Sequence, residues 1–215
     1  MSTALLFDNV SHSNLLCRFS CKFETGTRSL VLIAREEDSR QFARLITGMI
    51  QPDSGSINVL GFSLTDATSE ILMNLRLKVG IVPFSGGLVS NLKVWENIFL
   101  PMTYHFGEPA VQSQESARNY LDELGYKGKR MVLPAHLSLF EKRVVAFIRA
   151  AIMKPEMMLY CNSLEKISTT EQSMLLTVIN RFHAEMEERT SIVFASTTDA
   201  VDIHSFDNVI SLLQR

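Results

Sequence analysis

The chain has 215 residues, a formal net charge of −2 and 46% hydrophobic residues, which is enough apolar content for one globular domain. A charge this close to zero argues against nucleic acid as a partner. No apolar run is long enough to cross a bilayer, and the N-terminus lacks a basic segment followed by an apolar one. The three cysteines, Cys17, Cys21 and Cys161, form no C-x-x-C pair, which favours a reducing compartment. We therefore expect a cytosolic protein that serves a membrane, if at all, as a peripheral subunit.

Hydrophobic periodicity predicts strands that alternate with helices along the chain. The expected strands are 4–10, 16–23, 29–33, 57–60, 79–82, 157–160, 191–195 and 208–213. The expected helices are one that carries Phe42, Leu45, Ile46 and Met49, followed by helices near 67–77, 93–104, 111–124, 137–153 and 169–188. This alternation implies an α/β fold with a mostly parallel core. We expect a single domain over 1–215, with its core at about 1–87 and 154–215 and an inserted helical subdomain at about 88–153.

Residues 29 to 61, SLVLIAREEDSRQFARLITGMIQPDSGSINVLG, are the most informative stretch of the sequence. An apolar strand runs into a short loop, an amphipathic helix, a P-D-S-G turn and a second strand. That order resembles the start of an ATP-binding cassette (ABC) ATPase, whose phosphate-binding loop reads G-x-x-x-x-G-K-[ST]. The resemblance extends over essentially the whole chain. It implies an ABC-type nucleotide-binding-domain fold with an antiparallel N-terminal β portion beside the mostly parallel sheet.

The phosphate-binding loop keeps the frame of the family motif and loses its chemistry. Its four defining positions fall on Ile33, Asp38, Ser39 and Arg40. In the family the glycines let backbone amides wrap the phosphates, the lysine neutralises charge and the hydroxyl holds Mg²⁺. Here Glu36 and Glu37 join Asp38 at the start of the helix, where they complement its dipole and would repel a phosphate. We interpret the stretch as a well-capped core helix and expect no bound cofactor.

Later positions of the family's catalytic site are replaced as well. The glutamine that contacts Mg²⁺ after the strand at 79–82 is Phe84 here. The metal aspartate and the catalytic glutamate after the strand at 157–160 are Cys161 and Asn162, and the switch histidine is Thr198. These replacements remove metal binding and water activation together. The resemblance, with these losses, implies no catalytic residue and no metal site.

The segment LSLFEKRVVAFIRAAIMKPEMMLY resembles the family's signature helix and the strand after it, which usually begins with L-S-G-G-E. Ser138 is kept, and the two glycines have become Leu139 and Phe140. In an ABC dimer those glycines approach the partner's γ-phosphate. We expect the side chains of Leu139 and Phe140 to fill the space that this phosphate needs.

The phrase SGGLVSNLKVWENIFLP is particularly similar to ATPases of the Mla/MCE lipid-transport type, which sit on the cytoplasmic side of the inner membrane in diderm bacteria. In ABC ATPases this region grips the membrane permease. The resemblance therefore implies a permease interface that includes Ser85, Gly87, Leu88, Val89, Trp95 and Tyr104.

These observations together predict a pseudo-ATPase and not an enzyme. The expected protein is a peripheral subunit on the cytoplasmic side of the inner membrane that docks on an ABC permease, with lipid as the transported cargo. It pairs with an ABC ATPase as a heterodimer or with itself as a homodimer. Two alternatives remain: a residual ATPase or nucleotide sensor that uses unconventional ligands, and a soluble regulator that occupies an ABC subunit's place.

Overall fold

The computed structural model describes residues 2–107, 111–128, 130–199 and 201–213. Its strands are β1 (Thr3–His12), β2 (Leu16–Glu24), β3 (Arg28–Leu32), β4 (Ser54–Val59), β5 (Phe62–Ser63), β6 (Val79–Val82), β7 (Met157–Cys161), β8 (Thr190–Ala195) and β9 (Asn208–Ser211). Its α-helices are α1 (Glu36–Ile46), α2 (Ser69–Lys78), α3 (Val94–Phe106), α4 (Val111–Glu123), α5 (Leu139–Ala151) and α6 (Thr169–Ala184). Short 3-10 turns are η1 (Pro134–His136) and η2 (Ile203–Ser205).

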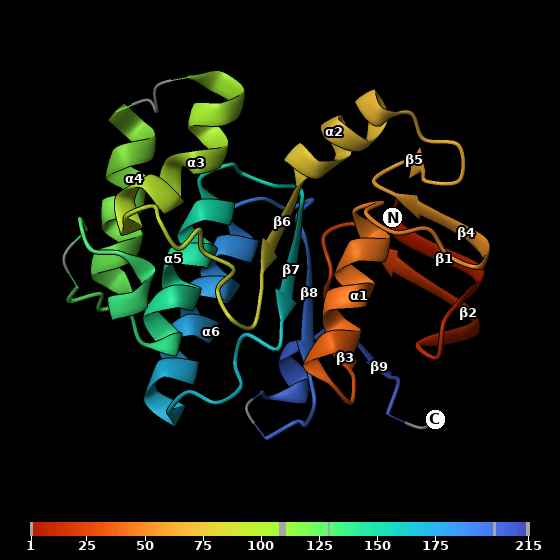
Figure 1. Ribbon diagram of the computed structural model, residues 1–215. Coiled ribbons are helices and arrows are strands. Elements are labelled where there is room, and N and C mark those ends of the chain that lie inside the picture. Colours follow the sequence, from red (N-terminus) through yellow and green to blue (C-terminus); the bar gives the residue numbers. More distant parts are fainter. Residues whose placement is uncertain (1, 108–110, 129, 200, 214–215) are drawn as a thin grey trace.

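The strands form two sheets with different hydrogen-bonding patterns. The first is antiparallel, in the order β2-β1-β4-β5, and the second is parallel, in the order β6-β7-β8-β3-β9. Helix α1 lies between the two sheets, and α5 and α6 cover the other face of the parallel sheet (Figure 1). Strand β7 is buried along its whole length because both faces of its sheet are covered.

Helix α1 joins the two sheets through a cluster of aromatic rings. Phe42, on its buried face, lies with its ring centroid 4.9 Å from that of Phe7 on β1 and 5.5 Å from that of Phe194 on β8. Phe19 of β2 completes the cluster at 6.1 Å from Phe42. Tilted and edge-on ring pairs at these distances add stability beyond the apolar area that they bury. The cluster holds α1 against β1, β2 and β8.

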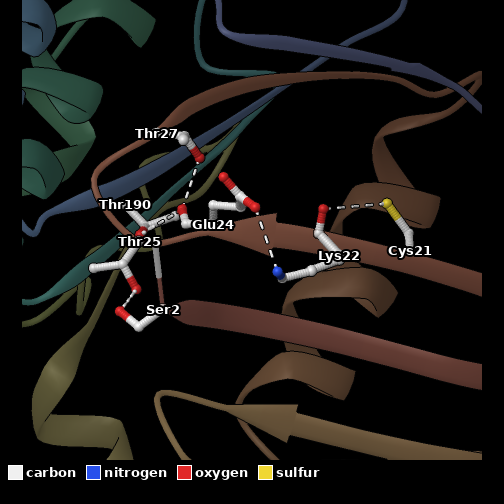
Figure 2. Close-up of polar contacts among 7 residues, drawn as sticks. All are labelled: Ser2, Cys21, Lys22, Glu24, Thr25, Thr27 and Thr190. Atoms are coloured by element: carbon white, nitrogen blue, oxygen red, sulfur yellow. Dashed lines mark hydrogen bonds and ion pairs between the residues drawn. The ribbon is translucent and has the colours of Figure 1, made fainter.

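The chain passes from the antiparallel sheet to the parallel sheet at the end of β2 (Figure 2). The carbonyl of Glu24 accepts hydrogen bonds from the Thr27 hydroxyl, at 2.7 Å, and from the Thr190 hydroxyl at the start of β8, at 3.4 Å. The Ser2 hydroxyl donates to the Thr25 hydroxyl at 2.9 Å, and Lys22 forms an ion pair with Glu24 at 3.3 Å. These contacts tie the first strand, the turn and the parallel sheet together.

Helices α3, α4 and α5 form a second layer beside the parallel sheet (Figure 1). Tyr120 of α4, Phe147 of α5 and Phe182 of α6 pack edge to face, with centroids 5.4–6.3 Å apart. In the part of the chain that the structure describes, no helix combines the length and apolarity needed to cross a bilayer.

The predicted α/β fold class, with its antiparallel N-terminal portion and mostly parallel core, is confirmed. Two sequence expectations differ from the structure. The helix expected at 169–188 ends at Ala184, before the charged turn that follows it. Strand β5 was not expected, because two residues carry no periodic signal.

Candidate functional site

The turn between β3 and α1 uses its own backbone donors. Helix α1 already begins at Glu36, with Arg35 as its N-cap. The amides of Asp38 and Ser39 donate to the Arg35 carbonyl at 3.0 and 3.4 Å, and the Ser39 hydroxyl donates to the Glu36 carbonyl at 2.8 Å. These groups occupy the positions where the family motif presents free donors to phosphate. Because they are satisfied inside the helix, they are not presented to a ligand.

The charges at this turn are also paired within the chain. Arg35 donates from Nε and Nη2 to the two carboxylate oxygens of Asp38, at 2.9 and 2.7 Å, in a bidentate pair. Arg40 forms an ion pair with Glu37 at 2.6 Å. Arg44, one turn further along α1, forms no ion pair with any residue that the structure describes. The cations nearest to the family's phosphate site are therefore arginines on the flank of α1.

The end of β7 faces Ser39 across the turn. The buried Cys161 thiol donates to the Ser39 carbonyl at 3.8 Å, and burial raises the pKa of this thiol to about 12. The thiol is therefore protonated at neutral pH, and only a thiolate is a good metal ligand. Asn162 is fully buried with a positive φ of 48°. Its amide donates to the Glu165 carboxylate at 2.7 Å, and the same oxygen accepts the Ser196 amide at 2.7 Å.

The family motif implies Mg²⁺ and ATP phosphates at this turn. The structure holds no group of three or more histidine, cysteine or acidic side chains placed to bind a metal among the residues it describes. Thr198, at the switch position, lies exposed in the turn after β8. The site residues do not fit the family's lysine-and-magnesium arrangement, and no hydrolytic step is derived through it.

Phe84 is held by a buried arginine that sequence reasoning missed. Arg143 of α5 is fully buried, and its guanidinium lies 4.6 Å from the centroid of the Phe84 ring. Its Nε donates to the Phe84 carbonyl at 2.8 Å, and its Nη1 donates to the carbonyls of Ser163, at 2.9 Å, and Glu165. Burial lowers the pKa of Arg143 to about 10. The sequence held one signal for this burial, because Arg143 directly precedes the apolar run VVAFI.

The signature helix starts with an intact cap. The Ser138 hydroxyl accepts the Glu141 amide at 3.1 Å, and the Glu141 carboxylate accepts the Ser138 amide at 2.8 Å. This cap starts α5 at Leu139 and turns Phe140 inward, where it is 8% exposed in the hydrophobic core. The expectation that Phe140 fills the space of a partner's phosphate is therefore wrong. Only Leu139, which is half-buried, can extend toward that space.

Two surface hollows meet at Ile81 of β6, and we call them together the groove. The first, of about 340 Å³, runs along α1 and is lined by Arg40, Arg44, Phe84 and Cys161, with Ser85 and Gly87 at its rim. The second, of about 220 Å³, lies between α2 and the α3–α5 pair. Its lining includes Leu77, Ile81, Pro101, His105 and Arg149.

The structure divides the predicted permease residues between different surfaces. Ser85 and Gly87 line the groove, and the Val89 side chain beside them is 38% exposed. Tyr104 is 80% exposed, with its ring centroid 4.8 Å from that of His105, which lines the groove. Leu88 is half-buried against the hydrophobic core.

Trp95 lies elsewhere. Its ring packs on Phe99, with centroids 4.8 Å apart, and both rings line a separate hollow beside α4. Trp95 and Tyr104 are nine residues apart, about two and a half helical turns, so they lie on opposite sides of α3. The two aromatic residues predicted for one interface cannot belong to the same flat surface.

Comparisons with known proteins agree on the family. A family model described as ABC transporter matches residues 41–161. The methionine import ATP-binding protein MetN of Haemophilus influenzae is 30% identical over 165 residues, which are 75% of this chain and 48% of MetN. The phospholipid transport ATP-binding protein MlaF of H. influenzae is 20% identical over 168 residues, 78% of this chain and 64% of MlaF. The chain spans about half the length of the curated relatives it matches.

Solved structures show the same fold. The chain matches MJ0796, described as a bacterial ABC transporter cassette, with a TM-score of 0.83, 16% identity and coverage of 98% of this chain and 97% of that one. It matches cbiO1 of Clostridium perfringens with a TM-score of 0.80, 18% identity and coverage of 98% and 85%.

The relatives correct one prediction. We expected a chain that is not an enzyme, but the relatives MetN and MlaF are named as ATP-binding proteins of transporters, which speaks against that expectation. The prediction of a pseudo-ATPase, made from single motif positions, is contradicted by these matches over most of the chain. By its family match, its fold and its relatives, the chain belongs to the ABC transporter family as an ATPase-like subunit.

Proposed function

We propose that this chain is the ATP-binding subunit of an ABC transporter, seated on the cytoplasmic face of the inner membrane against a permease. The observation that carries the proposal is the groove that meets at Ile81, between the parallel sheet and the α3–α5 pair. A concave, largely apolar surface of this kind accommodates a helix presented by a partner. We propose that a cytoplasmic helix of the permease lies there.

The groove is built in advance of docking. Arg149 of α5 donates to the carbonyls of Gly87, at 3.0 Å, and Gly86, at 3.3 Å, which fixes the loop at the rim. The buried Asn97 of α3 accepts the Val89 amide at 2.8 Å and donates to the carbonyls of Val89 and Leu92 at 3.0 and 2.8 Å. A loop held by this many hydrogen bonds loses little conformational entropy on binding, which favours affinity.

We propose that nucleotide binds at the α1 end of the groove, with arginines in place of the family lysine. Arg40 and Arg44 both line that hollow, and Arg44 forms no ion pair with any described residue. A guanidinium binds phosphate oxygens well because its planar fork matches their geometry. In this proposal, the two arginines of α1 neutralise the negative charge of the nucleotide's phosphates.

The second proposed partner is another ABC subunit, either a different ATPase or a second copy of this chain. Similar cassettes are described as dimers, including MJ0796 with bound ADP and phosphate. The capped start of α5, with Ser138 exposed and Leu139 half-buried beside it, is the surface that we expect such a partner to face. The cargo depends on the permease: relatives are named for methionine import and for phospholipid transport, and lipid stays our prediction through the likeness to MlaF.

The test is affinity purification of the tagged chain from detergent-solubilised membranes, with partners identified by mass spectrometry. We expect a permease and an ABC subunit with the wild-type chain. Val89→Asp should lose the permease, because it places a charge on an exposed apolar residue two positions after Gly87, which lines the groove. Val209→Asp is the matched control, since Val209 is similarly exposed on β9, away from the groove. A folded wild-type chain that recovers no permease would contradict the proposal.

A further inference from the structure

A third hollow lies on the side of the helical layer away from the groove. It measures about 340 Å³ and is lined by Trp95, Phe99, Leu100 and Thr103 of α3 and by Gln114 of α4. Leu100 is 37% exposed at its edge. The floor is aromatic: the rings of Trp95 and Phe99 meet edge to face at 4.8 Å. A large aromatic pair at the bottom of a surface hollow is the usual anchor of a protein interface.

Two cations stand over the Trp95 ring. The guanidinium carbons of Arg118 on α4 and of Arg130 lie 5.7 and 5.5 Å from the ring centroid. The Arg130 carbonyl also accepts the Trp95 amide at 3.0 Å, which holds this segment over the first turn of α3. Neither arginine forms an ion pair with any residue in the described part of the chain.

The acidic residues nearby do not neutralise these arginines. Glu96 lines the hollow, but its carboxylate accepts the Lys93 amide at 2.7 Å as part of the α3 cap. Glu115 and Asp122 stand on α4 near Arg118 in sequence, and neither forms an ion pair with it. The two exposed arginines beside this apolar hollow therefore have no ion-pair partner among the described residues. Carboxylates of a partner would form ion pairs with these two arginines.

We propose that this hollow binds an acidic amphipathic segment of a protein partner, with an apolar side chain against Trp95 and Phe99 and carboxylates on Arg118 and Arg130. The occupant is not the permease helix, because the hollow and the groove lie on opposite sides of α3. Trp95 and Phe99 face the hollow, whereas Pro101 and His105 face the groove. The groove and the hollow can be occupied at the same time. We therefore assign the segment to an additional protein that binds the helical layer. This inference does not depend on the proposed nucleotide or permease sites.

The chain itself supplies the probe, since Trp95 is its only tryptophan. The experiment titrates the full-length protein with three synthetic amphipathic peptides that share a Leu/Phe face and carry Glu, Gln or Lys on the other face. Trp95 fluorescence reports binding. We expect the Glu peptide to bind at least about tenfold more tightly than the Lys peptide, and its affinity to fall as salt is added.

The variant Arg118→Glu with Arg130→Glu should reverse that preference, so that the Lys peptide binds better. Both side chains are exposed, so the substitutions leave the core intact. Arg18→Glu, at an exposed position on β2, is the control for a charge reversal away from the hollow and should bind as the wild type does.

Three outcomes would overturn the proposal. One is no change in Trp95 fluorescence with the Glu peptide up to about 1 mM, the weakest affinity of interest. The second is equal binding of the three peptides, which would show an apolar hollow without selection for charge. The third is concentration-dependent self-association that the double Arg→Glu variant abolishes, which would assign this face to a second copy of the chain.

Discussion

The two sides of α3 carry the same kinds of residue in different arrangements. On the groove side, Arg149 is engaged, since its guanidinium donates to the carbonyls of Gly86 and Gly87 and shapes the loop. On the hollow side, the guanidinium groups of Arg118 and Arg130 lie over the Trp95 ring, and both residues are exposed. At the α3–α5 end of the groove, Arg149 thus shapes the loop through its hydrogen bonds, whereas Arg118 and Arg130 leave their charges exposed beside the hollow.

The difference is between a loop whose hydrogen bonds are already formed within the chain and a hollow whose arginines have no ion-pair partner among the described residues. A preformed, internally hydrogen-bonded groove suits a permanent partner whose contacts are mainly apolar. A hollow edged by unpaired cations suits a partner selected by charge and released by salt.

The largest effect should come from Arg143→Met, which removes the support beneath the groove. The Arg143 guanidinium donates to the carbonyls of Phe84, Ser163 and Glu165, and these would lose their buried partner. We expect the free energy of unfolding to fall by about 3 kcal/mol, measured by urea denaturation. Lys142→Met, one residue earlier on α5, should stay within about 0.5 kcal/mol of the wild type. Equal effects of the two substitutions would contradict this account.

A smaller loss of stability is expected at the groove rim from Gly86→Ala. Gly86 has a φ of +81°, and an added Cβ would lie 2.8 Å from both the Cβ and the carbonyl oxygen of Lys142. Gly61→Ala is the matched control, because Gly61 has a φ of +82° and nothing within 4 Å of its added Cβ. We expect about 1 kcal/mol for the control, from backbone strain alone, and about 2 kcal/mol or more for Gly86→Ala. Thermal denaturation of both variants measures the difference, which is the cost of the clash.

The nucleotide part of the proposal predicts an effect at the α1 end of the groove. The variant with Arg40→Ala and Arg44→Ala should bind Mg·ATP about tenfold more weakly than the wild type, because it loses the cations that line this hollow. Titration calorimetry on the purified chain measures the affinity. Arg18→Ala removes an exposed arginine at a distance from the groove and should leave the affinity unchanged. Wild-type affinity in the double variant would show that these arginines do not hold phosphate.

The smallest effect is expected in the alkylation rates of the three cysteines, which report how accessible Cys161 is at the α1 end of the groove. Burial raises the pKa of Cys161 to about 12 and raises the pKa of the half-buried Cys21, whereas Cys17 is exposed. A raised pKa lowers the fraction of reactive thiolate at neutral pH. We expect iodoacetamide at about pH 8 to modify Cys17 first, Cys21 next and Cys161 last, as followed by mass spectrometry. Early modification of Cys161 would mean that its contact with Ser39 opens readily.

The fold could be predicted from sequence because its signals are local. Each long strand and helix carries its own periodicity, and the P-D-S-G turn and the β3–α1 order resemble one family. The two faces of α3 could have been separated in the same way. The nine-residue spacing of Trp95 and Tyr104 within the expected helix at 93–104 already places them on opposite sides, but both were assigned to one docking surface.

The candidate site was predicted less well, because its contacts join residues far apart in the chain. The partners of Arg143 and the link from Asn162 through Glu165 to Ser196 depend on three loops that meet only in the folded protein. Phe140 was expected to extend toward a partner's phosphate because the family has glycines at this position and the one before it, whereas the Ser138 cap turns Phe140 into the core. The activity was predicted wrongly for a related reason, since single motif positions were weighed more heavily than similarity over most of the chain.

The most direct test of the account is site-specific photo-crosslinking from two positions on α3 in intact cells. A photoreactive phenylalanine replaces either His105, which lines the groove, or Thr103, which lines the hollow, and both positions are exposed. We predict that position 105 crosslinks to a membrane permease, and that position 103 crosslinks to a different protein through a segment rich in carboxylates. Crosslinking of the permease from position 103, or its absence from position 105 in the folded protein, would contradict the division of α3 into two separate docking surfaces.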